Sequence, residues 1–413
     1  MREMKDSGIE WAGVIPNTWN INKGKYFMEL LTRPTLETDE VITCFRDGEV
    51  TLRSKRREEG FTVSLTEAGY QGIEIGDLVV HGMDGFAGSI GISDSIGKAT
   101  PVLNVLDTEQ NKRYMMYLMR TMAYCELFLS LATGIRVRTC DTNWKKLREI
   151  DYILPTIPEQ KAIADFLDEQ CAEIDSLISD IQSQIEALEE YKRSVITEAV
   201  TKGLDPDVEM RDSGVQWIGM MPTHWDCQRG KYLLRYVQKP VRDDDGVITC
   251  FRDGEVTLRS NRREEGFTMA DKEIGYQGID VGDLVVHGMD GFAGSIGISD
   301  SKGKASPVLN VLDTEQNKRY IMYYLRSMAY NDVFVALATG IRVRSCDLRW
   351  NKLAELLYPM PPVEEQQAIV EHIDSVLERT NAIIADKKQQ IETIEEYKKS
   401  LIFEYVTGKK EVA

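Results

Sequence analysis

One stretch of this sequence occurs twice, first as Val41-Ile42-Thr43-Cys44-Phe45-Arg46-Asp47-Gly48 and again, 206 positions later, as Val247-Ile248-Thr249-Cys250-Phe251-Arg252-Asp253-Gly254. The same offset joins pairs along the whole chain: Trp11 and Trp217, Trp19 and Trp225, His81 and His287, Trp144 and Trp350, Glu159 and Glu365, and Tyr191 and Tyr397. Between positions 41 and 114 the copies differ at only ten positions. Two tandem copies of one unit therefore fill the chain.

The length and composition fit more than one hydrophobic core. A chain of 413 residues, 42% of them apolar, exceeds what one core usually supports, so we expect two to four domains. No run of 18 or more uncharged apolar residues occurs, and the first six residues lack the apolar stretch of a signal peptide. We therefore expect a cytoplasmic protein that does not enter a membrane.

Each copy contains two segments, a mixed globular domain followed by a long helix. Up to about residue 153 the first copy has the glycine, aromatic and β-branched content of a mixed domain, with short strands expected at Leu78–Val80 and Ser89–Ile92 and a helix at 113–131. From Glu159 to about Val200 no proline or glycine intervenes, which predicts one long helix. The second copy predicts its equivalent from Glu365 to about Val406.

Apolar residues along both long helices predict a helix pair with a buried seam. In the first helix they are Ile174, Leu177, Ile181, Leu188, Tyr191 and Val195, and in the second they are Ile383, Ile394, Tyr397 and Leu401. Thr380 and Lys387 interrupt the second stripe, as polar residues that fix register do. Pairing of like surfaces favours a pseudo-two-fold axis, and hence antiparallel helices.

These patterns predict an α+β protein with four segments. Residues 1–154 and 204–359 form two globular mixed α/β domains, and residues 155–203 and 360–413 form a long antiparallel intramolecular coiled coil that separates them, with pseudo-two-fold symmetry. The linker from Lys202 to Asp207 contains helix-stop residues that allow the second copy to begin.

The sequence offers no convincing catalytic or metal centre. Its seven cysteines form no Cys-x-x-Cys pair, and among four histidines only His81 and His287 are shared by the copies. Gly-x-Ser-x-Gly, His-Glu-x-x-His and the Asn/Asp-Pro-Pro-aromatic motif of an amino-methyltransferase are absent. The glycine-rich stretch from His81 to Gly91 lacks Gly-x-Gly-x-x-Gly spacing, and Gly91 to Lys98 fails the phosphate-loop spacing. We interpret these glycines as strand turns whose tips present His81 and Asp84.

Basic clusters recur in both copies although the net charge is −17. They are Arg53-Ser54-Lys55-Arg56-Arg57 and the pair Arg136 and Arg138, with their equivalents in the second copy. Arginine suits both phosphates and the guanine edge, and a DNA footprint needs only a local basic face. The alternative is a solvated, salt-bridged surface, since Glu58 and Glu59 follow the first cluster.

The candidate DNA-binding residues come from these clusters and from the glycine-rich turns. In the first copy they are Arg46, Arg53, Lys55, Arg56, Arg57, His81, Asp84, Lys98, Arg136 and Arg138. In the second copy they are Arg252, Arg259, Arg262, Arg263, His287, Asp290, Lys302, Lys304, Arg342 and Arg344. Replacing Arg56 and Arg57 by alanine is expected to weaken DNA binding and flatten its salt dependence.

Two passages resemble signatures of Type I restriction-modification specificity subunits. Asp212 to Gly219 followed by Pro222-Thr223-His224-Trp225 resembles the opening of a target-recognition domain, and Asp6 to Trp11 with Pro16 to Trp19 is its partner. Thr339-Gly340, Trp350 and Pro361-Pro362-Val363-Glu364-Glu365-Gln366 resemble the end of that domain and the start of a spacer helix. The first copy repeats this with Thr133-Gly134, Trp144 and Pro158-Glu159-Gln160.

This resemblance implies a non-catalytic subunit with two recognition domains, each reading one half of a bipartite site in double-stranded DNA. It implies two methyltransferase subunits as partners, which bind S-adenosylmethionine, and restriction subunits that can join; this chain itself is expected to hold no cofactor and no metal. Because the two domains are near copies, we predict half-sites that are inverted repeats or nearly so. Two rival hypotheses remain, a nucleotide-using enzyme and a coiled-coil scaffold whose globular domains bind protein.

Overall fold

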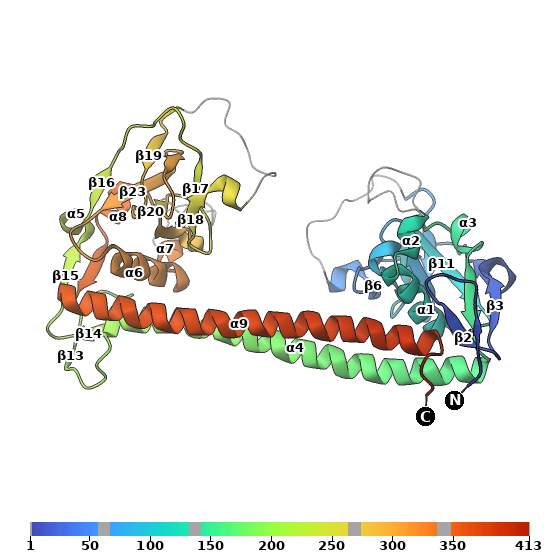
Figure 1. Ribbon diagram of the computed structural model, residues 1–413. Helices are drawn as coiled ribbons and strands as arrows, with labels where there is room; N and C mark the ends of the chain where they lie inside the picture. Colours follow the sequence, from blue (N-terminus) through green and yellow to red (C-terminus); the bar gives the residue numbers. More distant parts are fainter. Residues whose placement is uncertain (1, 57–66, 132–141, 263–273, 337–347, 413) are drawn as a thin grey trace. The chain divides into compact units, whose positions relative to one another are not determined.

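The computed structural model describes residues 2–56, 67–131, 142–262, 274–336 and 348–412. It combines short strands and short helices with two long helices, α4 (Ile157–Lys202) and α9 (Val363–Val406) (Figure 1). The chain divides into two compact units, one of residues 1–181 with 388–413 and the other of residues 182–387. Each unit therefore holds one globular domain and about half of each long helix. No helix in the described ranges has both the length and the apolar character that crossing a membrane requires.

The globular domain of the first unit is built around a four-stranded antiparallel sheet in the order β4-β11-β8-β9. These strands are Met28–Leu30, Leu103–Thr108, Leu78–His81 and Ile90–Ile92. Side chains alternate across β8: Leu78 and Val80 join one core and Val79 joins another. Helix α1 (Lys112–Tyr124) packs on the first face, and two strand pairs cover the second.

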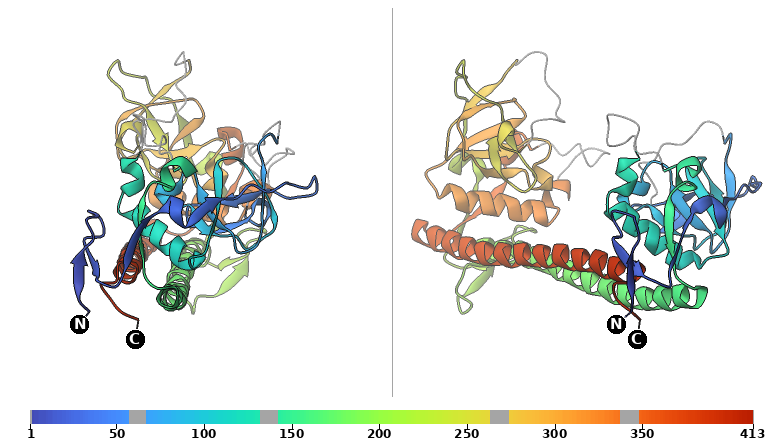
Figure 2. Two further views of the ribbon diagram at one scale, coloured as in Figure 1. Left: turned by 90° about the vertical axis from the view of Figure 1, so that its right-hand side faces the viewer. Right: turned by 45° about the vertical axis from the view of Figure 1, so that its right-hand side comes forward.

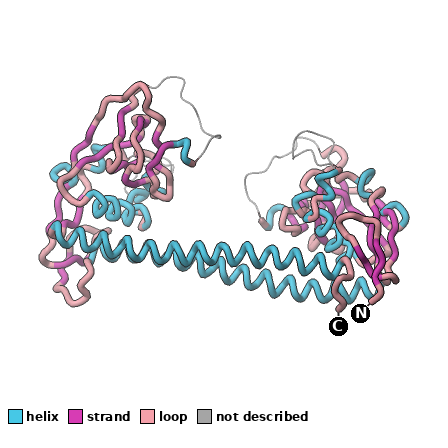
Figure 3. The backbone as a smooth tube through the Cα atoms, in the orientation of Figure 1, coloured by secondary structure: helices cyan, strands magenta, loops and turns pink. Residues whose placement is uncertain are grey.

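The remaining strands of this domain form separate pairs, visible among the strands of Figure 3. They are β1 (Met4–Asp6) with β2 (Val14–Pro16), β3 (Asn20–Lys23) with β12 (Asp151–Leu154), β5 (Ile42–Cys44) with β6 (Val50–Leu52), and β7 (Gln71–Ile73) with β10 (Gly97–Ala99). The predicted strand at Leu78–Val80 is confirmed and extends to His81. The helix predicted over 113–131 is interrupted: α1 ends at Tyr124, Glu126 adopts a φ of 58°, and α2 (Leu127–Ser130) follows.

The second unit repeats this architecture. Its sheet order is β16-β23-β20-β21, with strands Arg235–Val237, Leu309–Asp313, Leu284–His287 and Ile296–Ile298. The pairs are β13 (Met210–Asp212) with β14 (Met220–Pro222), β15 (Asp226–Arg229) with β24 (Leu357–Met360), β17 (Ile248–Cys250) with β18 (Val256–Leu258), and β19 (Gln277–Ile279) with β22 (Gly303–Ala305). Its helices are α5 (Gly230–Leu233), α6 (Lys318–Tyr330), α7 (Val333–Ala336) and α8 (Trp350–Leu353), and the first unit has α3 (Trp144–Leu147) in the place of α8.

A buried glutamine joins each long helix to its own globular domain. The side-chain oxygen of Gln160 accepts the amide N–H of Asn111 at 2.9 Å, and its amide donates to the Pro155 carbonyl at 2.9 Å. Gln366 makes the equivalent bonds to Asn317 and Pro361. Since Asn111 caps α1, this one side chain holds the start of α4 against the start of α1. The glutamine of the sequence signature thus has a structural role.

The end of each long helix packs on the globular domain of the other copy. In the first unit Leu401, Ile402 and Val406 of α9 belong to the main core, and the Tyr114 hydroxyl lies 3.2 Å from the Val406 carbonyl oxygen. In the second unit Ile196, Ala199 and Val200 of α4 take these places. Both chain termini lie in the first unit (Figure 2), where Arg2 pairs with Glu411 at 3.0 Å.

Within each unit the two half-helices run antiparallel. In the first, the rings of Phe166 and Tyr405 lie 4.5 Å apart, and Asp175 accepts from Lys398 at 2.6 Å. In the second, Lys387 donates to Gln184 at 2.5 Å. The buried and half-buried positions Cys171, Ile174, Ile178 and Ile181 follow one another at alternating steps of three and four, as in a coiled coil.

Part of the predicted seam is wrong. Ile174, Ile181 and Leu401 are buried, and Leu188, Val195 and Ile394 are half-buried. Four residues assigned to the seam are about half exposed instead: Leu177 (49%), Tyr191 (52%), Ile383 (47%) and Tyr397 (56%). Each directly precedes a seam position, such as Ile178 or Ile384. The predicted stripe of apolar residues therefore contains both buried seam residues and residues of the exposed face beside the seam. Thr380, expected to interrupt the stripe, is buried and donates its hydroxyl to the Val376 carbonyl at 2.8 Å.

Candidate nucleic-acid interface

The tip of the β5–β6 hairpin meets the turn that follows β8, and each supplies one charged side chain. Arg46, on the hairpin, is 63% exposed and donates to Asp84 at 2.9 Å. The second domain repeats the pair with Arg252 and Asp290 at 3.2 Å. Two segments that are far apart in sequence thus present an arginine held by a carboxylate at equivalent places in both domains.

Glycine allows the hairpin to approach the sheet this closely. A Cβ atom at Gly91 would lie 1.9 Å from the carbonyl oxygen of Gly48, so no other residue fits there without moving the hairpin. Arg120 of α1 donates to that same carbonyl at 3.0 Å and to the Ile90 carbonyl at 2.7 Å. Gly297 makes the same approach to Gly254 in the second domain. Gly91 and Gly297 lie in the middle of strands β9 and β21, so at these two positions the predicted strand turn is wrong and the glycine permits a close backbone approach instead.

A second arginine stacks on the hairpin. The guanidinium of Arg56 lies over the Phe45 ring, 4.3 Å from its centroid, and pairs with Asp47 at 2.7 Å. Arg262 repeats both contacts with Phe251 and Asp253, at the same two distances. Stacking and ion pairing fix the plane of each guanidinium, which reduces the entropy lost when it binds a ligand.

His81 stabilises the turn and keeps one donor available. Its Nδ1 accepts the backbone N–H groups of Met83 at 3.2 Å and Asp84 at 3.0 Å. Burial lowers the pKa of His81, and the same cause lowers the pKa of His287. The ring is therefore neutral at pH 7, with its proton on Nε2, where it can donate to a ligand.

These side chains line one pocket of about 470 Å³, bounded by Thr43 to Asp47, Arg56, His81, Asp84 and Ser89. The Ser89 hydroxyl is buried and has no hydrogen-bond partner among the residues that the structure describes. Burial raises the pKa of the Cys44 thiol to about 12, so this cysteine is no nucleophile at neutral pH. Guanidinium, imidazole, hydroxyl and carboxylate groups converge, which suits hydrogen bonding to base edges and phosphates rather than covalent chemistry.

Other predicted residues lie elsewhere. Arg53 donates to Thr43 at 3.1 Å, and Arg259 to Thr249 at 3.2 Å. The Lys98 side chain is only 7% exposed and pairs with Glu67 at 2.8 Å, so its ammonium is engaged inside the domain. Its equivalent Lys304 is half-buried, whereas Lys302 is exposed. The remaining candidates lie outside the described residues: Arg57, Arg136, Arg138, Arg263, Arg342 and Arg344.

Sequence reasoning missed Phe45 and Arg120, along with their equivalents in the second domain. Phe45 is an uncharged residue of the repeated stretch, and Arg120 lies inside a predicted helix. The repetition of Phe45 and Arg120 in the second copy does not mark them as functional, because almost every neighbouring residue is repeated as well. Only the folded hairpin brings Phe45 to the pocket and the Gly48 carbonyl to Arg120.

The long helices carry a second repeated surface. Leu177 and Tyr397 lie in the first unit at flanking positions on the same side of the antiparallel pair, and Ile383 and Tyr191 take these places in the second. We call each pair a flanking patch. Exposed Glu392 and Glu396 lie on the same helix as Tyr397, and Glu186 and Glu190 on that of Tyr191. Each unit thus presents one apolar patch with acidic neighbours.

Comparison with known proteins points to one family. No family model matches the chain. It is 24% identical over 322 residues to the putative type I restriction enzyme MjaX specificity subunit of Methanocaldococcus jannaschii, covering 74% of this chain and 71% of that protein. It is 27% identical over 326 residues to the type I restriction enzyme MjaVIII specificity subunit of the same organism, covering 73% and 72%.

The fold agrees with this similarity. The fold resembles that of one chain in a solved structure, with a TM-score of 0.65 and 12% identity over 95% of this chain and 98% of that one. That structure is described as showing the complex assembly and conformational transition of the type I R-M system. The fold likeness covers nearly the whole molecule, and the sequence similarity covers three quarters of it. The chain is thus similar in sequence, over about three quarters of its length, to specificity subunits of type I restriction enzymes, and its fold resembles that of a chain from a type I R-M system.

Proposed function

We propose that this chain selects the DNA target of a Type I restriction-modification complex, with each globular domain reading one half of a bipartite site. The observation that carries this proposal is the repeated cluster of Arg46, Asp84, His81 and Arg56, which recurs with the same contacts around Arg252. Paired arginine and aspartate groups complement the guanine and cytosine edges in the major groove. A protein that recognises two similar half-sites needs two similar clusters of side chains.

The long helices are proposed to hold the two recognition domains apart as an antiparallel coiled coil with pseudo-two-fold symmetry. The antiparallel contacts inside each unit support this arrangement, as does the equivalent packing of Val200 and Val406 on the two domains. Such a spacer would set the length of unspecified DNA between the half-sites. Inverted-repeat half-sites follow from the near-identity of the domains.

The flanking patches are proposed to bind two methyltransferase subunits, and restriction subunits can join the complex. Two equivalent patches fit two copies of one partner, because a repeated surface offers the same contacts twice. S-adenosylmethionine is expected in the methyltransferase subunits and not in this chain. The acidic residues beside Tyr191 and Tyr397 favour a partner surface with basic residues. We place the assembled complex in the cytoplasm.

Replacing Tyr191 and Tyr397 by alanine is expected to weaken methyltransferase binding by roughly 10-fold to 100-fold for each patch, as loss of a central aromatic anchor does. Each tyrosine is about half exposed, so its replacement removes little buried surface. Titration calorimetry with purified methyltransferase subunit measures the affinity. The matched control replaces Tyr26 and Tyr232, which are 73% and 76% exposed on the globular domains. Equal losses in both double variants would contradict this assignment.

The direct experiment purifies the chain together with its methyltransferase subunit and footprints the complex on genomic fragments. We expect protection of one bipartite sequence with an unprotected or weakly protected middle. A coiled-coil scaffold whose globular domains bind protein would protect no defined sequence. The nucleotide-enzyme hypothesis instead predicts that the isolated chain binds ATP or S-adenosylmethionine in equilibrium dialysis.

A further inference from the structure

The two recognition domains differ in charge at one corner. Of the ten substitutions between positions 41 and 114, two among the described residues change charge: Lys55 becomes Asn261, and Ile96 becomes Lys302. Both positions adjoin one turn, because Lys55 contacts Asp94 and Ser95, the residues directly before Ile96. One lysine is lost and another gained at the same corner, so the charge is conserved but its position moves.

In the first domain the lysine is held by the turn. The Lys55 ammonium donates to the Ser95 hydroxyl at 2.9 Å and lies 3.3 Å from Asp94. The Thr51 hydroxyl donates to the same carboxylate at 3.1 Å. Ile96 beside them is 64% exposed and carries no charge. The positive charge of this corner is thus neutralised within the protein.

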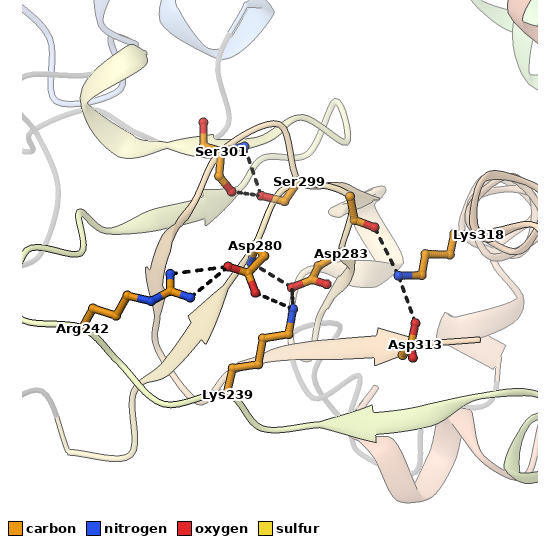
Figure 4. A network of polar contacts seen from close by, with 9 residues as sticks. Lys239, Arg242, Asp280, Asp283, Ser299, Ser301, Asp313 and Lys318 are labelled. Atoms are coloured by element: carbon orange, nitrogen blue, oxygen red, sulfur yellow. Dashed lines mark hydrogen bonds and ion pairs between the residues drawn. The ribbon is translucent and has the colours of Figure 1, made fainter. Parts of the chain in front are cut away.

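In the second domain the equivalent turn is held by hydrogen bonds that involve no lysine. The Asn261 amide donates to the Thr257 hydroxyl at 2.9 Å. Ser301 donates to Asp300 at 2.5 Å, and Ser299 donates to the Ser301 carbonyl at 2.8 Å, as Figure 4 shows for the serine pair. Lys302 follows directly, is exposed, and makes no ion pair with any residue in the described ranges.

The corner borders the candidate interface. The Asp300 amide donates to the Val256 carbonyl at 3.0 Å, which fixes the turn beside strand β18. That strand leads through Arg259–Asn261 directly to Arg262, the arginine stacked on Phe251. At this corner Lys55 and Asn261 bond to neighbouring residues of their own domains, whereas Lys302 is exposed and has no ion-pair partner among the described residues. The two domains therefore differ in whether the lysine of this corner is engaged by the protein or left available to a ligand beside the interface.

We infer that Lys302 contacts a DNA phosphate for which the first domain has no matching contact. The second domain then holds its half-site more strongly at low salt. This inference rests on the proposed DNA-reading function. It implies that on DNA with one intact half-site the second domain is the one that engages.

The test measures the salt dependence of target binding by the complex of this chain with its methyltransferase subunit. One phosphate contact contributes about 0.9 to the slope of log affinity against log salt concentration. The K302A variant should lose that amount, which corresponds to a roughly threefold smaller fall in affinity between 50 and 200 mM salt. I96K should gain about the same amount. K55A is the matched control, because it removes a lysine that is already paired, and its slope should equal that of the wild type.

An unchanged slope for K302A would overturn the inference, as would equal changes in K302A and K55A. Melting temperatures of all variants guard against a folding defect, and I96K provides a gain that no folding defect can mimic. Failure of the wild-type complex to protect any defined target would instead refute the DNA-reading function, and with it this inference. The two failures are therefore distinguishable.

Discussion

Replacing Arg46 and Arg252 together by alanine is expected to abolish target recognition by the assembled complex. Each arginine is more than 60% exposed and held by a single aspartate, and Arg46 lines the pocket of the first domain. A bidentate arginine contact with guanine contributes about 1–3 kcal/mol of discrimination, roughly 5-fold to 150-fold per domain. The two losses multiply, because one bound complex uses both domains. Methylation of a plasmid carrying the target, and gel-shift affinity for it, measure the effect.

Arg235 provides the control for this experiment. It is 64% exposed and pairs with Asp313 at 2.9 Å, so it resembles Arg46 in exposure and partner but lies on β16 and not on the β17–β18 hairpin that carries Arg252. R235A should leave both readouts unchanged. If R46A/R252A binds its target as tightly as R235A does, the paired arginines are surface residues without a role in recognition.

The second large effect is a loss of stability in one globular domain, caused by a substitution in the other copy of the repeat. Val200 belongs to the first copy but is fully buried in the core of the second unit, and Val406 takes the equivalent place in the first unit. V200D should therefore destabilise the second globular domain, and V406D the first. An uncompensated buried carboxylate costs on the order of 3–5 kcal/mol, a large part of a domain's stability. Hydrogen exchange followed by mass spectrometry resolves the two domains separately.

Ser194 and Ser400 supply matched controls, since both are exposed positions on the same two helices. S194D and S400D add the same charge without burying it and should leave exchange in both domains unchanged. Faster exchange in the domain of the mutated copy, instead of the other domain, would contradict the packing described here.

The repeat and the helices could be predicted because they depend on local patterns. Helix α4 begins at Ile157, two residues before its predicted start, since Pro158 is tolerated in the first turn. The seam was harder, because Leu177 and Tyr191 are apolar at almost the spacing that a seam requires. Only the register of the helix pair separates a seam position from its neighbour.

The candidate interface was predictable in residue type but not in arrangement. Arg46, Arg56, His81 and Asp84 were candidates and the fold brings them to one pocket, whereas Lys98 is buried against Glu67. Charge alone cannot separate these cases, since burial depends on which strands pair. The close approach of Gly91 to Gly48, which positions the hairpin, is a contact between segments more than 40 residues apart.

The negative net charge of the chain is compatible with a DNA-reading role because DNA binding needs only a local basic surface. Exposed arginines lie at the hairpins, as Arg46 and Arg252 do, and exposed glutamates lie on the helices near Tyr191 and Tyr397. Net charge sums over both, so the value of −17 says little about either surface.

Mapping methylated bases across the genome of cells that carry this system tests the central claim most directly. Two near-identical reading clusters predict one bipartite motif whose halves are inverted repeats, or differ at no more than one base pair, around an unspecified spacer. A motif with two unrelated halves, or one with a single continuous half, would contradict the account.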